Sequence, residues 1–210
     1  MAEKKSGYPV NLSIDYPKQL NRLTTFFRFI LVIPIIIILA MLIGSYKDSN
    51  ASENARFLFA GGGFVFIPTV LMILFRKKYP KWWFDWNVAL VKFAIRIVSY
   101  LIFLRDEYPS TDEEQAVHIK IAYPNAKKDL KRGMPLVKWL LALPHYIVLA
   151  FLATAAVFCI LIAWFAVLFT GKYPKGLFDF VVGVLRWDLR VDAYVFLLTT
   201  DQYPPFTLYQ

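Results

Sequence analysis

Three long apolar runs constrain the fold of this chain more than any other feature. The runs cover residues 24–44, 56–75 and 135–169, and the third holds 35 residues, of which only Lys138 and His145 are ionisable. A helix of about 20 residues crosses a hydrocarbon layer of about 30 Å. The third run would form a straight helix of about 52 Å, which is too long for one crossing. The runs therefore predict membrane-spanning helices, with the third run folded as a hairpin of two spans.

Composition agrees with a membrane protein and excludes several other classes. Hydrophobic residues make up 58% of the chain, and the net charge is +9. The basic residues flank the apolar runs, so membrane topology and anionic lipid explain the charge better than a nucleic-acid partner does. Cys159 is the single cysteine, which excludes a disulfide framework and a thiolate metal cluster. The first run lacks a small-residue cleavage site, so a removable signal peptide is not predicted.

The chain contains an internal duplication. Residues from Val10 onward resemble those from Val117 onward, and residues 75–109 align with residues 169–204. Each half begins with an alternating stretch that predicts a β-strand. A pair of apolar spans follows, then a Tyr-Pro-Lys motif, an amphipathic helix and a closing Tyr-Pro. We predict two repeats, residues 1–109 and 110–210, within one membrane domain. Pro34 and Pro144 occupy matching places and predict a shared bend, interpreted as a packing adjustment in preference to a gating hinge.

Charge distribution selects a topology. Residues 1–28, 76–138 and 170–210 hold 22 of the 24 lysines and arginines. If each half crosses the membrane twice, all three segments lie on one side, as the positive-inside tendency favours. The predicted fold is therefore an all-α membrane protein with four transmembrane helices as two duplicated hairpins. An interfacial amphipathic helix follows each hairpin, and short β-strands lie on the cytoplasmic side. This places the chain in the plasma membrane with both termini in the cytoplasm.

The two amphipathic helices repeat one polar stripe. Steps of seven, four and four residues keep each set on a narrow helical face; the sets are Asp85, Lys92, Arg96 and Tyr100, and Asp179, Arg186, Arg190 and Tyr194. Three interpretations remain open. The charges can complement helix dipoles and protein carbonyls, the four cations can bind lipid phosphates or other anions, or the stripe can line a conducting path.

The second half also carries a family resemblance. The motifs "LVKWLLALPHYIVLAFL" and "TGKYPKGLFDFVVGVLRWDLRVDAYVFLLTTDQYPPF" resemble a prokaryotic membrane-protein family catalogued as domain of unknown function 4389. The resemblance covers nearly all of the second half and, more weakly, the first. It implies a multi-pass membrane protein and carries no catalytic residues. In the first half Trp82 and Trp83 replace the matching Gly176 and Leu177, so the resemblance does not imply one role for both halves.

The sequence shows no catalytic constellation. His118 and His145 are isolated from other metal ligands, and no glycine loop of the phosphate-binding type is present. We therefore predict no enzymatic activity, no cofactor and no metal. The primary hypothesis is an accessory or scaffold protein that binds anionic lipid headgroups, a membrane partner or a second copy of itself. The alternative is an oligomeric channel or small-solute transporter.

Overall fold

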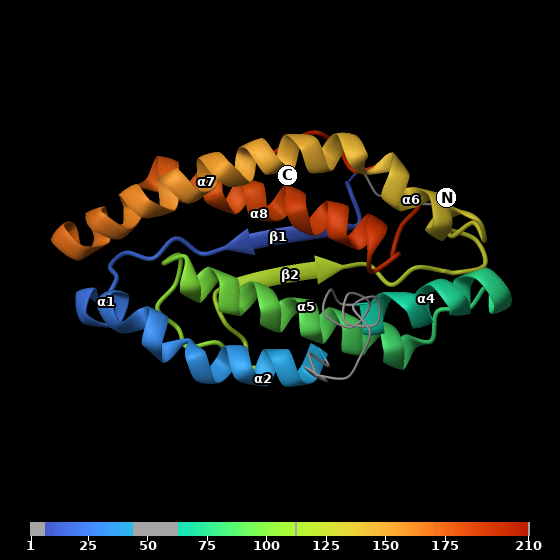
Figure 1. Ribbon diagram of the computed structural model, residues 1–210, viewed down its shortest axis with the longest axis horizontal. Coiled ribbons are helices and arrows are strands. Elements are labelled where there is room, and N and C mark those ends of the chain that lie inside the picture. Colours follow the sequence, from blue (N-terminus) through green and yellow to red (C-terminus); the bar gives the residue numbers. More distant parts are fainter. Residues whose placement is uncertain (1–6, 44–62, 112, 210) are drawn as a thin grey trace, which may run out of the picture.

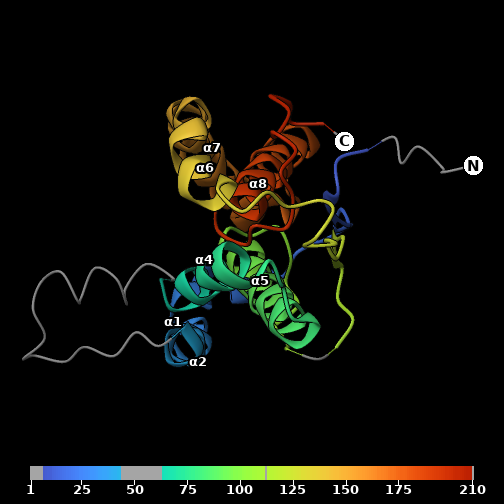
Figure 2. The same cartoon turned by 90° about the vertical axis from the view of Figure 1, so that its right-hand side faces the viewer.

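The computed structural model describes residues 7–43, 63–111 and 113–209, which form three layers (Figures 1 and 2). The outer layer contains α1 (Arg22–Leu31), α2 (Ile33–Ile43), α6 (Met134–Leu141) and α7 (Leu143–Thr170). The middle layer contains α5 (Lys81–Leu101) and α8 (Lys175–Val195), and α4 (Gly63–Arg76) contacts α6. Strands β1 (Val10–Ile14) and β2 (Val117–Ile121) lie on the side opposite the outer layer (Figure 2).

The two predicted strands are confirmed, and they pair with each other. They form an antiparallel two-stranded sheet in which Leu12 faces Ile119. Successive side chains of a strand point to opposite faces, so the alternating pattern buries one face. Val10, Leu12 and Ile119 are buried, while the paired Asn11 and Lys120 belong to the opposite face. Strand β1 packs on α8, and β2 packs on α5.

The two predicted amphipathic helices are confirmed as helices, but not as interfacial ones. Each follows a Tyr-Pro pair, with Pro80 or Pro174 at the N-cap, where the missing N–H of proline costs no helical hydrogen bond. Helix α8 packs between β1 and α7, and α5 packs on β2 and α2. The buried apolar side chains of both helices are therefore covered by protein rather than by acyl chains, while Trp82 and Trp86 of α5 are exposed.

The prediction of four transmembrane helices is wrong. Residues 135–169 contain one break, at Ala142, and α7 then continues for 28 residues without a hairpin. Beyond Pro144 the run has no proline or glycine to interrupt the helix, which ends at Gly171 in the left-handed conformation that glycine favours at a C-cap. Among the described residues α7 alone has the length and apolar composition of a membrane span. The α1–α2 pair, bent by 42°, counts as a second only if both helices form one span.

The polar loop of residues 45–54, expected to close the first hairpin, lies outside the described residues. The cytoplasmic placement of both termini follows from a four-span count, and it stays a prediction. Breaks at Val32 and Ala142 do occur at matching places, two residues before Pro34 and Pro144.

Contacts between the two halves are reciprocal. The Tyr16 hydroxyl donates to the carbonyl oxygen of Tyr173, and the matching Tyr123 hydroxyl donates to that of Tyr79. The Tyr16 ring packs edge-on against Phe178 at 5.1 Å. The Tyr123 ring packs in the same way against Phe84, at 5.0 Å. Such reciprocity is the mark of a two-fold relation, so the aligned segments clasp each other across an approximate two-fold axis through the sheet. The boundary at residues 109 and 110 stays a prediction.

Candidate functional site

The two arginines of the α8 stripe bind protein carbonyls. Arg186 donates to the carbonyl oxygen of Leu12 from Nε and to that of Leu208 from Nη1, both at 2.8 Å. Arg190, which is 3% exposed, donates to the carbonyl oxygens of Thr207 at 3.2 Å and Tyr209 at 2.8 Å. The pair therefore holds the C-terminal tail (residues 205–209) against α8. These bonds match the first of the three interpretations of the stripe, while anion binding stays a prediction.

The α5 stripe is only partly engaged. Arg96 donates from Nη1 to the carbonyl oxygen of Ser110 at 2.7 Å. Asp85 pairs with Lys81 at 2.7 Å on the exposed surface. Its counterpart Asp179 is also exposed. Lys92 is exposed as well, and it has no hydrogen-bond or ion-pair partner within the described ranges.

A buried cation lies beside Tyr100, and we call this group the Arg28 cluster: Arg28, Asp106, Tyr100 and Tyr108. Arg28 is fully buried in α1 and forms an ion pair with Asp106. Its guanidinium donates to the Tyr100 carbonyl oxygen at 2.9 Å and lies 4.6 Å from the centroid of the Tyr100 ring. The Tyr108 ring packs edge-on against Tyr100 at 5.7 Å. A cation–π contact adds to the ion pair at such a distance.

The second half contains a matching group, the Lys138 cluster: Lys138, Asp201, Tyr194 and Tyr203. The Lys138 ammonium is buried, lies 2.8 Å from the Asp201 carboxylate and lies 4.9 Å from the Tyr194 ring centroid. It also donates to the carbonyl oxygen of Thr200 at 2.7 Å. Tyr203 packs edge-on against Tyr194 at 5.9 Å. Burial lowers the pKa of Lys138, and the hydrogen bond that its ammonium donates to Asp201 opposes this shift.

Each cluster fastens a closing Tyr-Pro segment to the start of an outer helix. The Asp106 carboxylate accepts the backbone N–H of Asn21 at 2.6 Å, and the Asp201 carboxylate accepts that of Lys131 at 2.7 Å. The sequence did contain a signal for both clusters. Arg28 and Lys138 are charges inside apolar runs, each six residues before a matching proline. Sequence reasoning did not connect them to Asp106 and Asp201, because these carboxylates are more than 60 residues away.

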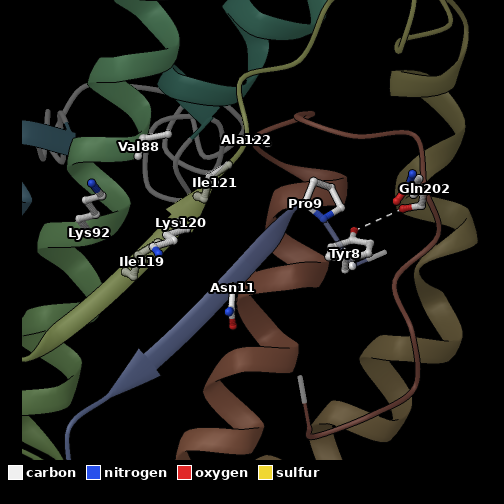
Figure 3. Close-up of a pocket in the computed structure, with 11 residues that line it drawn as sticks. Tyr8, Pro9, Asn11, Val88, Lys92, Ile119, Lys120, Ile121, Ala122 and Gln202 are labelled. Atoms are coloured by element: carbon white, nitrogen blue, oxygen red, sulfur yellow. Dashed lines mark hydrogen bonds between the residues drawn. The ribbon is translucent and has the colours of Figure 1, made fainter. Parts of the chain in front are cut away.

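An open groove of about 620 Å³ crosses the sheet next to α5 (Figure 3). Lys92 and Val88 line it from α5, and residues 119–122 line it from β2 and the position that follows. The lining also includes Gly7, Tyr8, Pro9, Asn11 and Gln202. The Tyr8 hydroxyl donates to the Gln202 carbonyl oxygen at 3.3 Å, and burial raises the pKa of Tyr8. Lys92 and Lys120 are the only formally charged side chains of this lining at neutral pH. The groove is therefore suited to an anionic or carbonyl-rich ligand.

Two carboxylates one helical turn apart lie on α8. Asp188 lines an apolar cavity of about 400 Å³ together with residues of α5 and α7. Burial, with a smaller effect from the Asp188 charge, raises the pKa of Asp192 to about 7. The Asp188 side chain itself is exposed. The described part of the chain contains no group of three or more ligand residues that could hold a metal ion.

Fold and site together define a layered helical protein with an exposed apolar outer layer, paired buried cations and a basic groove beside the sheet. Residues 134–207 match the model of the family described as Domain of unknown function (DUF4389). This match covers the whole Lys138 cluster and supports the family that the second-half motifs resemble. No curated protein and no solved structure matches the chain.

Proposed function

We propose that the protein is a non-enzymatic membrane scaffold whose outer layer is embedded in one leaflet of a lipid bilayer. In this arrangement α1, α2, α6 and α7 lie along the membrane, with their apolar side chains among the acyl chains. The sheet and its groove face the aqueous phase. The observation that carries the proposal is the apolar surface of the outer layer.

Large apolar side chains of the outer layer are uncovered by protein. Leu23 on α1 is 70% exposed, Met41 on α2 is 77% exposed, and Phe151 and Phe169 on α7 are 74% and 75% exposed. Only 17% of the most apolar window of α7 is buried inside the protein, whereas the core helix of a water-soluble protein is mostly buried. Apolar surfaces this extensive need a nonpolar partner. Acyl chains can surround every side of a helix that protein leaves uncovered.

The position of the sheet favours an outer layer lying along the membrane. Strands β1 and β2 are separated from α7 by α8, and along the axis of α7 they lie level with the half that is nearer α6 (Figure 1). If α7 crossed the bilayer, Lys120 and the exposed His118 would lie at the depth of the hydrocarbon core, where charged groups cost several kcal/mol. The two buried cations of the outer layer, Arg28 and Lys138, fit either depth because both are paired with carboxylates.

Cysteine labelling tests this orientation. The single native thiol is removed by Cys159→Ser, and Arg132→Cys and Lys172→Cys then mark the exposed polar segments before α6 and after α7. After reconstitution into sealed vesicles, we expect an impermeant maleimide to react with both positions from the same side. Reaction of the two positions from opposite sides would refute the in-plane arrangement.

Depth-dependent quenching tests membrane insertion itself. A fluorophore attached through Phe151→Cys should be quenched by spin-labelled acyl chains, whereas one attached through Lys120→Cys should be quenched by aqueous iodide. The net charge of +9 predicts tighter association with vesicles that contain anionic lipid than with neutral ones. Equal access of iodide to both fluorophores would contradict insertion.

A further inference from the structure

Helices α5 and α8 occupy matching places, but in the described part of the chain an extended segment packs on Gly183 of α8 and none packs on the matching position of α5. The C-terminal tail packs so closely on Gly183 that an added Cβ would lie 3.0 Å from the Leu208 Cβ. The residue that matches Gly183 on α5 is Ala89, and Ala89 is exposed. The face that binds an extended peptide in the second half is therefore open in the first half.

Lys92 on α5 matches Arg186 on α8, but only Arg186 has hydrogen-bond partners among the described residues. Arg186 joins the edge of β1 to the tail through the carbonyl oxygens of Leu12 and Leu208. Lys92 lies at the matching place, but its ammonium has no partner in the described ranges. The Lys92 side chain lines the groove that runs along β2 (Figure 3). The helix thus presents a cationic donor where its counterpart binds peptide carbonyls.

The neighbouring edge of β2 also has backbone groups that bond to no other group among the described residues. Asp15 donates to Ala116 and Ala122 donates to Pro9 across the sheet, so the hydrogen-bonded pairs alternate with pairs such as Leu12 and Ile119. In an antiparallel pair, the N–H and C=O of residues between hydrogen-bonded pairs point away from the partner strand. Ile119, which lines the groove, therefore turns its backbone groups to the free edge. Edges of this kind accept extended peptides.

We propose that this groove, bounded by α5 and β2, docks an extended acidic peptide segment of a partner protein. The backbone of the peptide lies along the face of Ala89 and Lys92, as the tail lies along Gly183 and Arg186. An acidic side chain of the peptide meets Lys92 and Lys120, the two formal charges of the lining. The mode of binding is thus taken from the second half of the same chain, and the acidity follows from charge complementarity.

A partner peptide suits the groove better than a lipid headgroup does. The sheet lies on the side of the molecule away from α6 and α7 (Figure 2). A bilayer that contacts the exposed apolar residues of the outer layer would not reach Lys120. This inference names a partner for the proposed scaffold and takes its preference for a peptide from that membrane orientation. The binding test uses protein in detergent micelles, so it fails or succeeds independently of the vesicle experiments.

Fluorescence anisotropy with a labelled peptide tests the docking. The probe is a synthetic peptide with the sequence of residues 200–209, TDQYPPFTLY, which contains the tail and one acidic residue. We expect saturable binding to the full chain, weakened about tenfold by the combined substitutions Lys92→Glu and Lys120→Glu. The control Lys175→Glu changes an exposed lysine outside the groove and should leave binding unchanged.

Disulfide trapping locates the bound peptide. A peptide carrying Leu208→Cys, activated as a mixed disulfide, should cross-link to Ala89→Cys in a Cys159→Ser background, because Ala89 matches Gly183. Ala89 lies between Val88 and Lys92, which line the groove, whereas the control Trp82→Cys lies at a 69% exposed position nearer the start of α5 and should cross-link far less. Equal trapping at both positions overturns the proposal.

Two further results would also overturn it. The first is no saturable binding up to about 1 mM peptide, or unchanged binding by the double lysine variant. The second is complete competition by inorganic phosphate or by anionic lipid added to the micelles, which would assign the groove to a free anion or a lipid headgroup. A retained affinity in the presence of both competitors supports a peptide partner.

Discussion

Helices α5 and α8 have matching sequences and matching neighbours, yet their polar stripes differ in use. On α8, Arg186 and Arg190 donate hydrogen bonds to carbonyl oxygens of the C-terminal tail, and Arg186 also donates one to the edge of β1. On α5, Arg96 binds Ser110, while Lys92 keeps its ammonium free of partners in the described residues. A duplicated stripe therefore need not keep one role, because a different segment of the chain packs on each copy.

The largest expected effect distinguishes the two buried cation clusters. Asp106→Ala leaves the Arg28 guanidinium buried without its carboxylate, and arginine cannot release its proton in a protein. We expect a loss of about 3–5 kcal/mol in the free energy of unfolding. Asp201→Ala should cost less, since Lys138 already has a lowered pKa and can become neutral. Thermal unfolding in detergent measures both.

The exposed Asp85→Ala serves as the control for these variants and should change little. Equal losses for Asp106→Ala and Asp201→Ala would show that the two clusters stabilise the fold alike, whatever the cation.

The second effect is a pH dependence present on α8 and absent from α5. The pKa of Asp192 is raised from 3.8 to about 7, so the folded state favours the protonated carboxyl. In the unfolded state the carboxyl regains its ordinary pKa and loses its proton more readily. The free energy of unfolding should therefore fall as pH rises between about 4 and 7 and level off above that range. Asp192→Asn should flatten this part of the profile and raise the unfolding temperature at pH 8.

The residue that matches Asp192 on α5 is Val98, so the first half contributes no corresponding slope. A profile that keeps its slope in Asp192→Asn would assign the titration to another group.

The third effect compares the two cations at one position of the stripe. Arg186→Ala leaves the carbonyl oxygens of Leu12 and Leu208 without their donor, and we expect a loss of about 1–3 kcal/mol. Lys92→Ala removes an exposed side chain with no partner in the described ranges, so a change within about 0.5 kcal/mol is expected. A large loss for Lys92→Ala would mean that the ammonium supports the fold.

The smallest effect concerns the tail itself. Gly183→Ala places a methyl group against Leu208, but alanine also has a helix propensity about 1 kcal/mol better than glycine. The two terms offset each other in stability, so the readout is faster proteolysis of the tail. The reverse change, Ala89→Gly, should cost about 1 kcal/mol through propensity alone and leave the tail protected.

Local patterns predicted the elements whose signals are local. The alternation around Leu12 and Ile119 gave both strands, and the Tyr-Pro-Lys motifs located the first turns of α5 and α8. The expected hairpin in residues 135–169 failed because hydropathy alone cannot say where an apolar run turns. Only Pro144 offers a break, and it lies near one end of the run.

The sequence also could not predict that the apolar side of α8 packs on protein. Amphipathicity shows that one face is apolar, but not whether lipid or β1 covers it. The cation clusters depend on a partner carboxylate far along the chain, as with Arg28 and Asp106, and repeat alignment alone did not reveal their contact.

The pairing of β1 with β2 has a consequence for biosynthesis. Leu12 meets Ile119, so more than 100 residues must leave the ribosome before the sheet can close. During that interval the apolar surfaces of α1 and α2 have neither the sheet nor the second half beside them. Contacts so distant in sequence form slowly and leave intermediates prone to aggregate. The first half therefore needs an apolar environment early, and delivery to a membrane while translation continues would supply it.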